Sequence, residues 1–345
     1  MLWAAIALAA CGPAPAPPAP DPATTEAERE GARRYLAALA PLPEGWRPGR
    51  FAPEPGVSLE TASIPARGAR RGTVIFMPGY TAPLELYAAE LGQLADAGWD
   101  VAALSQRGQG RSTRSGRTHD MGHVEDYAAL VTDLRAFAAT QLGPVTVVGV
   151  SMGGNVALRM AALDPPGVEA VAAIVPLVRI ELGPIPPWAA RALAEVTDRI
   201  GLGRRYAPGP GPWDEAGLFT DPAALAEPTL CSTVPERAHL RDALFTLDPS
   251  LRVDAPSYGW VAATFRSQDA LARAAPAVDV PVLMVTAGAD RIVSTPAASA
   301  LCERIETCVE LRLADAPHCL IEGDRTEARA VMRTVTDYLG AVVLR

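Results

Sequence analysis

A serine lies at the centre of a Gly-Val-Ser-Met-Gly motif at 149–153, directly after an apolar run at 145–148. A buried strand, a sharp turn and a helix in succession form the setting in which G-x-S-x-G makes a nucleophile elbow. Gly149 and Gly153 lack side chains that would clash in so tight a turn. The start of a helix also favours a developing negative charge. The motif therefore predicts that Ser151 is a nucleophile; an ordinary glycine-rich strand-to-helix turn is the alternative interpretation.

A serine nucleophile requires a general base and an acid that orients the base. Asp290 and His318 each follow a later apolar run, and they come after Ser151 in that order. Alone, each would be an ordinary turn or structural residue. Together they predict a catalytic triad of Ser151, His318 and Asp290. Asp315 is a competing carboxylate, but its position just before His318 suits a loop-capping role better.

Acyl transfer through a tetrahedral intermediate also requires backbone donors for the oxyanion. The amide of Met152, which follows the nucleophile, is one predicted donor. The other is the amide of Tyr80, in the loop after the first apolar run, where Gly79 permits a close approach. These groups need no metal or cofactor. No C-x-x-C occurs and the four histidines do not pair at metal-ligand spacings, so a zinc site is not expected.

The elements that must position these residues alternate between strand and helix patterns. Strands are predicted at 73–77, 100–104, 145–150, 168–175, 280–286 and 309–313. Helices are predicted at 26–39, 84–97, 123–141, 155–161, 296–305 and 325–339. This alternation predicts an α/β fold with a mostly parallel, doubly wound sheet.

A segment at 177–275 breaks this alternation with prolines, loops and helical stretches. We interpret it as a mainly helical cap, inserted after the strand that follows the nucleophile helix. Its larger apolar residues either form a small core of the cap or line an acyl-chain tunnel. The predicted organisation is a lipoprotein-type signal at 1–11, an Ala/Pro-rich tether with a short helix at 12–45, core segments at 46–176 and 276–345, and the cap between them.

Several motifs are similar to those of one known family. Arg-Gly-Gln-Gly-Arg-Ser at 107–112, Gly-His-Val-Glu-Asp-Tyr at 122–127 and Tyr-Gly-Trp at 258–260, together with the elbow, resemble the lysophospholipase L2 and monoacylglycerol lipase group. That group belongs to the α/β-hydrolase superfamily and is related to S33-type serine hydrolases. The resemblance covers about 72–339. It implies an α/β-hydrolase fold and a serine ester hydrolase acting on monoacyl lipids.

Composition limits the classes of partner. The chain has 345 residues, 49% of them hydrophobic, and a formal net charge of −8. This is a globular composition, and the acidic balance without a basic, aromatic patch argues against nucleic-acid binding. Cys302 and Cys308 bracket a short connection that a disulfide could close in an oxidising compartment; two free thiols are the alternative. The sequence does not predict the oligomeric state.

The first residues resemble a bacterial lipoprotein signal. An apolar run at 2–10 ends in Leu-Ala-Ala-Cys-Gly at 8–12, which would make Cys11 the lipidated residue, and a Pro-rich tether follows. The run is short and no Lys or Arg precedes it. We expect a lipid-anchored protein on the periplasmic side of the cell envelope, in contact with a membrane surface. A cytoplasmic protein with an unprocessed extension is the alternative.

The expected function is hydrolysis of monoacyl lipid esters through an acyl-enzyme on Ser151. Within enzymes, a carboxylesterase or an amidase or peptidase with the same triad is the alternative. Outside enzymes, the alternative is a lipid-binding or scaffold lipoprotein that retains the fold.

Overall fold

The computed structural model describes residues 24–209, 211–213, 219, 234, 237 and 239–343. Within these residues, eight strands form one sheet in the order β1-β2-β4-β3-β5-β6-β7-β8. β2 pairs antiparallel with both β1 and β4, and all other pairs are parallel. The strands are β1 (Arg47–Phe51), β2 (Leu59–Ile64), β3 (Gly72–Met77), β4 (Trp99–Leu104), β5 (Val145–Val150), β6 (Val168–Ile174), β7 (Val282–Ala287) and β8 (Cys308–Leu313). The prediction of a mostly parallel α/β sheet is confirmed.

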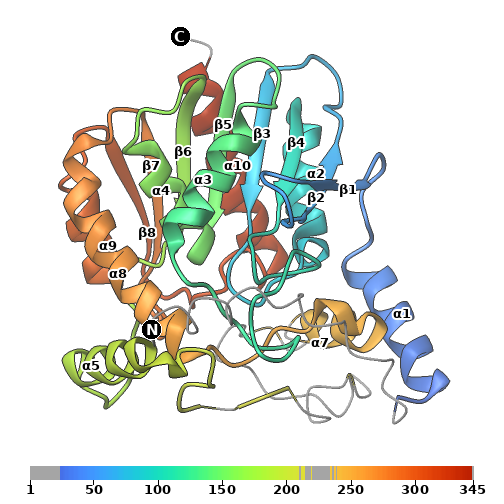
Figure 1. The fold of residues 1–345 in the computed structure, drawn as a ribbon. Coiled ribbons are helices and arrows are strands. Elements are labelled where there is room, and N and C mark those ends of the chain that lie inside the picture. Colours follow the sequence, from blue (N-terminus) through green and yellow to red (C-terminus); the bar gives the residue numbers. More distant parts are fainter. Residues whose placement is uncertain are drawn as a thin grey trace.

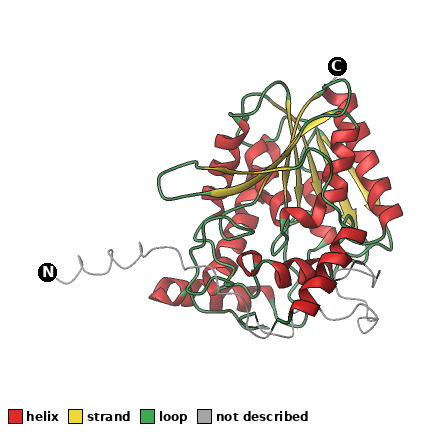
Figure 2. Ribbon diagram, turned by 90° about the vertical axis from the view of Figure 1, so that its right-hand side faces the viewer, coloured by secondary structure: helices red, strands yellow, loops and turns green. Residues whose placement is uncertain are grey.

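Helices cover both faces of this sheet (Figures 1 and 2). α2 and α10 contact each other on one face, and α3, α4 and α8 contact one another on the opposite face. This is the layering that right-handed β-α-β crossovers produce. The helices and helical turns are α1 (Glu26–Leu39), η2 (Leu84–Tyr87), α2 (Ala88–Asp96), α3 (Tyr127–Ala138), α4 (Met152–Ala161), α5 (Pro187–Thr197), η3 (Asp198–Leu202), α7 (Leu240–Leu247), η6 (Pro249–Leu251), α8 (Tyr258–Ala274), η7 (Ala275–Ala277), α9 (Thr295–Cys302) and α10 (Arg325–Val343).

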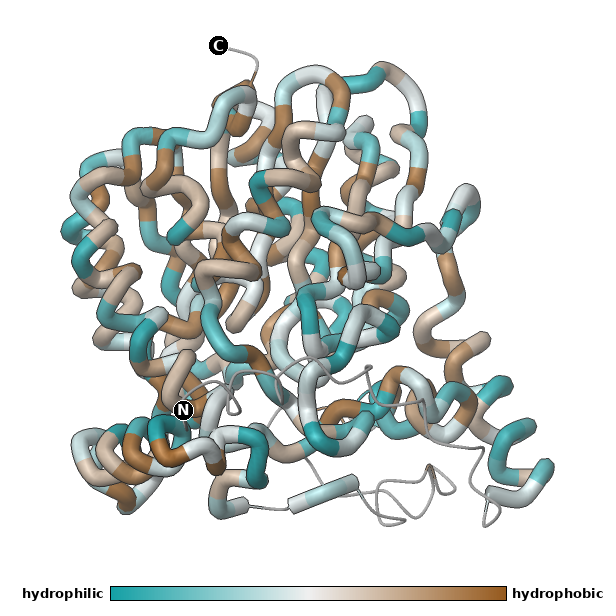
Figure 3. The backbone as a smooth tube through the Cα atoms, viewed as in Figure 1, coloured by the Kyte–Doolittle hydropathy of each residue, from teal (hydrophilic) through white to brown (hydrophobic). Residues whose placement is uncertain are grey.

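The core lies where the central strands meet these helices. Every residue of β3, β5 and β7 is buried, which is expected for parallel strands that are covered on both faces. Apolar residues recur along these strands in Figure 3. The sheet is therefore a rigid base, and the residues at the carboxyl ends of its strands are held firmly in place.

The edge hairpin of β1 and β2 was not predicted from the sequence. β1 is short, contains Pro48 and Gly49, and is exposed along most of its length, so no alternating apolar pattern marks it. Its backbone pairing with β2 (Arg47 opposite Ser63, through Phe51 opposite Leu59) makes it a strand. Backbone pairing in the folded protein makes such a segment a strand, because its mostly exposed side chains show no alternating apolar pattern in the sequence.

The segment between β6 and β7 is helical within its described residues. Figure 1 places α5 and α7 beyond the ends of the strands, below the sheet in that view. α8 contacts α5 and also α3 and α4, so it joins this segment to the helical layer. α1, whose predicted bounds are confirmed, contacts α7, and Tyr35 of α1 packs on Phe219 with ring centroids 4.8 Å apart. The predicted limits of the cap at 177 and 275 stay predictions.

The apolar residues of this segment divide into two groups. Leu244, Phe245 and Trp260 are buried, whereas Trp188 and Ile200 are exposed by 75% and 65%. The described residues include no helix that is long and apolar enough to cross a membrane. A disulfide joins Cys302 and Cys308, with 5.4 Å between their Cα atoms. Cys11, the predicted lipidation site, lies outside the described residues.

Candidate active site

Ser151 occupies the sharp turn between β5 and α4. Its backbone has φ 50° and ψ −109°, a conformation that L-residues rarely adopt, and its amide donates to Ile174 O at 2.9 Å. A Cβ on Gly149 would lie 2.5 Å from Gly153 O, and a Cβ on Gly153 would lie 2.4 Å from Met77 O. Only glycine therefore fits on either side of the serine. This geometry is that of the elbow predicted from the sequence.

The structure brings Ser151, His318 and Asp290 together from the ends of three segments. Ser151 Oγ lies 3.1 Å from His318 Nε2, and His318 Nδ1 lies 2.6 Å from Asp290 Oδ2. The Asp290 side chain is fully buried and the His318 side chain is 9% exposed. Because Nδ1 faces a carboxylate, it carries the proton, and Nε2 is then free to accept the proton of the serine hydroxyl. The competing Asp315 is exposed.

The two predicted oxyanion donors lie beside the serine. Gly79 is so close that a Cβ on it would lie 3.5 Å from Ser151 Cβ. Met152 is the first residue of α4. The backbone amides of Tyr80 and Met152 have no hydrogen-bond acceptor within the described part of the chain. Both N–H groups are therefore available to a ligand at the nucleophile.

Two glutamines hold the loop that carries Tyr80, and the sequence analysis did not assign them this role. Gln106 Nε2 donates to Pro78 O at 2.9 Å, and the Thr81 amide donates to Gln109 Oε1 at 2.7 Å. Both glutamines are buried, and Thr81 has a positive φ of 63°. The Arg-Gly-Gln-Gly-Arg-Ser motif at 107–112 was the available signal for Gln109, which it contains, whereas Gln106 directly precedes it. Tyr80 itself is fixed by its hydroxyl, which donates to Asp254 O at 2.7 Å.

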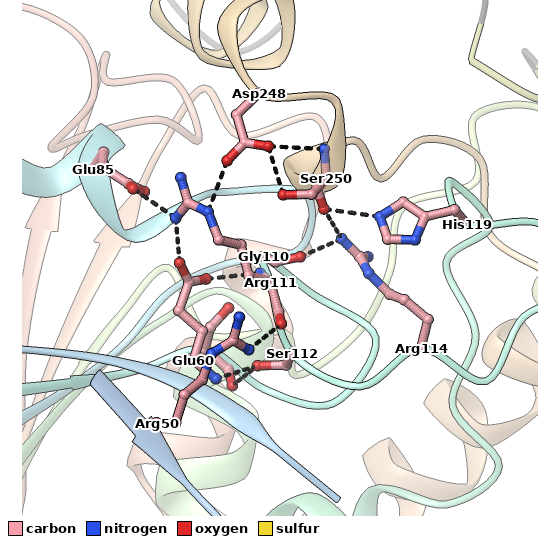
Figure 4. A network of polar contacts seen from close by, with 11 residues as sticks. Arg50, Glu60, Glu85, Gly110, Arg111, Ser112, Arg114, His119, Asp248 and Ser250 are labelled. Carbon is pink, nitrogen blue, oxygen red and sulfur yellow. Dashed lines mark hydrogen bonds and ion pairs between the residues drawn. The ribbon is translucent and has the colours of Figure 1, made fainter. Parts of the chain in front are cut away.

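A second part of that motif joins three distant segments (Figure 4). The Arg111 guanidinium forms ion pairs with Glu60 of β2, with Glu85 of η2 at 2.7 Å, and with Asp248 of the cap segment at 2.8 Å. Burial raises the pKa of Glu60, and Arg111 opposes that rise. Arg111 thus fixes the cap segment and η2 against the sheet, close to the loop that carries Tyr80.

A pocket of about 430 Å³ opens at Ser151 and His318. Its apolar wall is formed by Leu86, Val150, Ile174, Ile292, Leu320 and Ile321. Tyr87, Arg237, Arg241, Asp242 and Glu322 form its polar part. Apart from the elbow, the triad and the predicted oxyanion loop with Gly79 and Tyr80, none of this lining was predicted from the sequence. None of the described large apolar residues of the 177–275 segment lines the pocket, because its apolar wall comes from η2, from the ends of β5 and β6 and from loops of the core.

No group of three or more His, Cys, Asp or Glu side chains among the described residues is arranged to hold a metal ion. A nucleophile, a base oriented by a buried carboxylate and two free amide donors are the parts that acyl transfer requires.

The fold and this arrangement place the protein in the class of α/β-hydrolases with a serine at the elbow. A family model for serine aminopeptidases, S33, matches residues 68–321. The chain belongs to that family.

Comparison with individual proteins gives more distant likenesses. The chain is 29% identical over 279 residues to lysophospholipase L2 of Escherichia coli strain K12, covering 77% of this chain and 78% of that protein. A monoacylglycerol lipase of Paleococcus ferrophilus superposes with a TM-score of 0.63 at 21% identity, over 82% of this chain and 98% of the other. A soluble variant of monoglyceride lipase from Saccharomyces cerevisiae, in complex with a substrate analogue, gives 0.66 at 15% identity, over 85% and 95%. The two structures show a shared fold, and the family makes the protein a hydrolase.

Proposed function

We propose that the protein hydrolyses carboxylic esters of monoacyl lipids, in the manner of a lysophospholipase or monoacylglycerol lipase. The observation that carries the proposal is the hydrogen-bonded series from Ser151 Oγ through His318 to Asp290 at the mouth of a pocket with an apolar wall. The likeness to lysophospholipase L2 supports the same substrate class.

The proposed mechanism follows from the positions of the donors and acceptors. His318 Nε2 takes the proton of Ser151 as Oγ attacks the ester carbonyl, and the carbonyl oxygen becomes an oxyanion held by the amides of Tyr80 and Met152. Asp290 stabilises the imidazolium that forms. The imidazolium then protonates the leaving alcohol. Water, activated by His318, attacks the acyl-enzyme, and the fatty acid leaves as Ser151 regains its proton.

Ser151→Ala tests this proposal. The substitution removes Oγ and should lower kcat by about 10⁴-fold or more on a lysophospholipid, without changing the thermal unfolding temperature by more than a few degrees. A fluorophosphonate probe should label the wild type and not the variant. Ser299→Ala, on α9, is the matched control and should keep both ester turnover and labelling by the probe. A variant at Ser151 that turns over normally, or a folded wild type that resists the probe, would contradict the mechanism.

An amidase or peptidase with the same residues is the second candidate, since the matching family is named for serine aminopeptidases. An aminopeptidase in particular must bind the free amino group of its substrate, for which a carboxylate is the natural acceptor. Asp242 and Glu322 line the pocket, but Asp242 is paired with His239 at 2.9 Å and Glu322 accepts the Tyr87 hydroxyl. These contacts favour the ester function over an aminopeptidase, and they do not bear on other amidases. A panel of lysophospholipids, monoacylglycerols, short esters and aminoacyl amides separates the two by kcat/KM.

We also propose that the protein is lipid-anchored through Cys11 in a bacterial cell envelope. The Leu-Ala-Ala-Cys-Gly sequence and the Pro-rich segment after it support this proposal. Intact mass spectrometry of the mature protein should find an acylated Cys11 as its first residue. A protein that retains an unmodified Met1 would contradict the anchor without affecting the proposed chemistry.

A further inference from the structure

A second pocket, of about 270 Å³, lies between α2 and α10. Arginines dominate its wall: Arg325, Arg329 and Arg333 recur at every fourth position of α10, so they lie on one face of that helix. Arg237, from the cap segment, completes the set. Opposite them, α2 contributes Gln93 and two carboxylates.

Arg237 is the buried member of this set. The residue is 5% exposed, yet its Nη1 and Nη2 atoms have no hydrogen-bond partner within the described part of the chain. Its Nε donates to Glu322 O at 3.2 Å, and Nη2 lies 3.6 Å from Glu90 Oε1, which is an ion pair without a hydrogen bond. A buried guanidinium with two unsatisfied nitrogens is costly unless something binds them. Among the described residues, one guanidinium at the pocket thus has two donor nitrogens without a hydrogen-bond acceptor.

The carboxylates of the pocket do not neutralise the arginines. Asp96 is already paired with Arg67, which does not line the pocket. No described carboxylate forms an ion pair with Arg325, Arg329 or Arg333. Four guanidinium groups therefore line a pocket with two acids. One of these, Asp96, is paired with Arg67, and the other, Glu90, has only its 3.6 Å contact with Arg237 among the described ion pairs.

We propose that this pocket binds a phosphate group. Guanidinium groups match phosphate oxygens with paired N–H donors, and the unsatisfied nitrogens of Arg237 supply such a pair at the inner end of the pocket. Arg329 and Arg333, which are exposed on α10, supply positive charge at the outer end. The phosphate belongs either to the head group of a lipid or to free phosphate.

Arg237 also connects this pocket to the catalytic one. It lines both pockets, and it bonds to the backbone of Glu322, whose side chain accepts the hydroxyl of Tyr87 beside the nucleophile. In the lipid form of the proposal, a lysophospholipid with its ester at Ser151 places its head group toward Arg237. This lipid form of the inference rests on the proposed function, whereas binding of a phosphate group does not.

The binding test is isothermal titration calorimetry of the full chain with two probes, inorganic phosphate and glycerophosphocholine, at constant ionic strength. Glycerophosphocholine carries the phosphodiester without an acyl chain. We expect saturable binding of one equivalent of at least one probe. R329A/R333A should weaken it about tenfold, because two charged donors are lost. The control R304A/R312A removes the same charge from exposed arginines that line neither pocket, and should change affinity by less than about twofold.

The outcomes separate the sources of phosphate. The pocket is assigned to the lipid head group by two results together. Glycerophosphocholine binds more tightly than inorganic phosphate, and the ratio of KM for lysophospholipid to KM for monoacylglycerol rises in R329A/R333A but not in the control. Tighter binding of inorganic phosphate with an unchanged KM ratio assigns it to free phosphate. The proposal is overturned if neither probe binds, or if both double variants weaken binding equally. Fluorophosphonate labelling of Ser151 reports on the catalytic proposal independently of these measurements.

Discussion

At the scale of single residues, Asp290 has two separate hydrogen-bonding tasks. Its Oδ1 accepts the amides of Ile292 and Val293 at 2.8 and 2.9 Å, and its Oδ2 faces His318 Nδ1. The two amides fix the carboxylate before substrate binds. The orientation of the imidazole is therefore set by a turn of the chain as well as by charge.

Asp290→Asn tests that arrangement. The asparagine oxygen must stay with the two amide donors, so its NH₂ group faces His318 Nδ1 and moves the imidazole proton to Nε2. His318 can then no longer accept the serine proton, and kcat should fall by about 10³- to 10⁴-fold near neutral pH. Steady-state ester hydrolysis measures the effect. Asp315→Asn is the control; if it lost as much activity as Asp290→Asn, the assignment of the orienting acid would be wrong.

Gln109 acts through the loop it holds. Replacing it with Met preserves the length of the side chain but leaves the Thr81 amide without its acceptor, so the neighbouring Tyr80 amide loses its fixed position. We expect kcat to fall by about ten- to a hundredfold with little change in KM, because an oxyanion donor acts mainly in the transition state. Gln141→Met, in the turn that follows α3, is the control. An equal fall in kcat in both variants, or a rise in KM alone, would contradict a positioning role for Gln109.

At the scale of elements, the elbow depends on how closely α4 approaches β3 and β5. Gly153 lies against the backbone oxygens of Met77 and Pro78, so the helix starts almost in contact with the neighbouring strand. This approach brings the Met152 amide next to Ser151 and next to the loop after β3. The distance between two elements, rather than one side chain, therefore sets the geometry of the proposed oxyanion donors.

Gly153→Ala should disturb both stability and activity. A Cβ 2.4 Å from a backbone oxygen cannot be accommodated unless α4 or β3 moves, so we expect a loss of roughly 2–4 kcal/mol in the free energy of unfolding. Urea denaturation measures it, and kcat should fall in the folded fraction. Gly31→Ala, in α1, meets nothing closer than 3.7 Å and should be neutral or slightly stabilising. Full stability of Gly153→Ala would contradict the steric argument.

At the scale of the whole molecule, buried acids link the fold to pH. Burial raises the pKa of Glu90 from its ordinary value of 4.5 to about 7, and the neighbouring Arg237 opposes the rise. Burial also raises the pKa values of Glu60 and Glu322. Between the unfolded and folded pKa values, the folded state holds a proton that the unfolded chain releases. The stability that this proton provides is present below about pH 4.5 and is lost as pH rises through about 7.

Glu90→Gln should therefore reduce the fall in stability between pH 5 and pH 8. Removing the titrating group should make the decrease in the free energy of unfolding from pH 5 to pH 8 smaller by roughly 1–3 kcal/mol. The part of the pH dependence that comes from Glu60 and Glu322 should remain. Urea denaturation at a series of pH values measures it. Glu303→Gln, an exposed glutamate after α9, is the control and should keep the wild-type slope. An unchanged slope in Glu90→Gln would show that Glu90 ionises normally in the folded protein.

The fold class, the order of the central strands and helices along the chain, and the grouping of Ser151, His318 and Asp290 could be predicted from the sequence. These features are local: apolar runs, glycines and chain order carry them. The β1–β2 hairpin, the apolar wall of the pocket at Ser151, the contacts of Gln106 and Gln109, and the position of Arg237 beside α10 became visible only in the folded protein. Residues distant in sequence create each of these, and no periodicity marks which side chains will meet once the elements have packed. The substrate class depends on such contacts between distant residues, and therefore on the folded molecule.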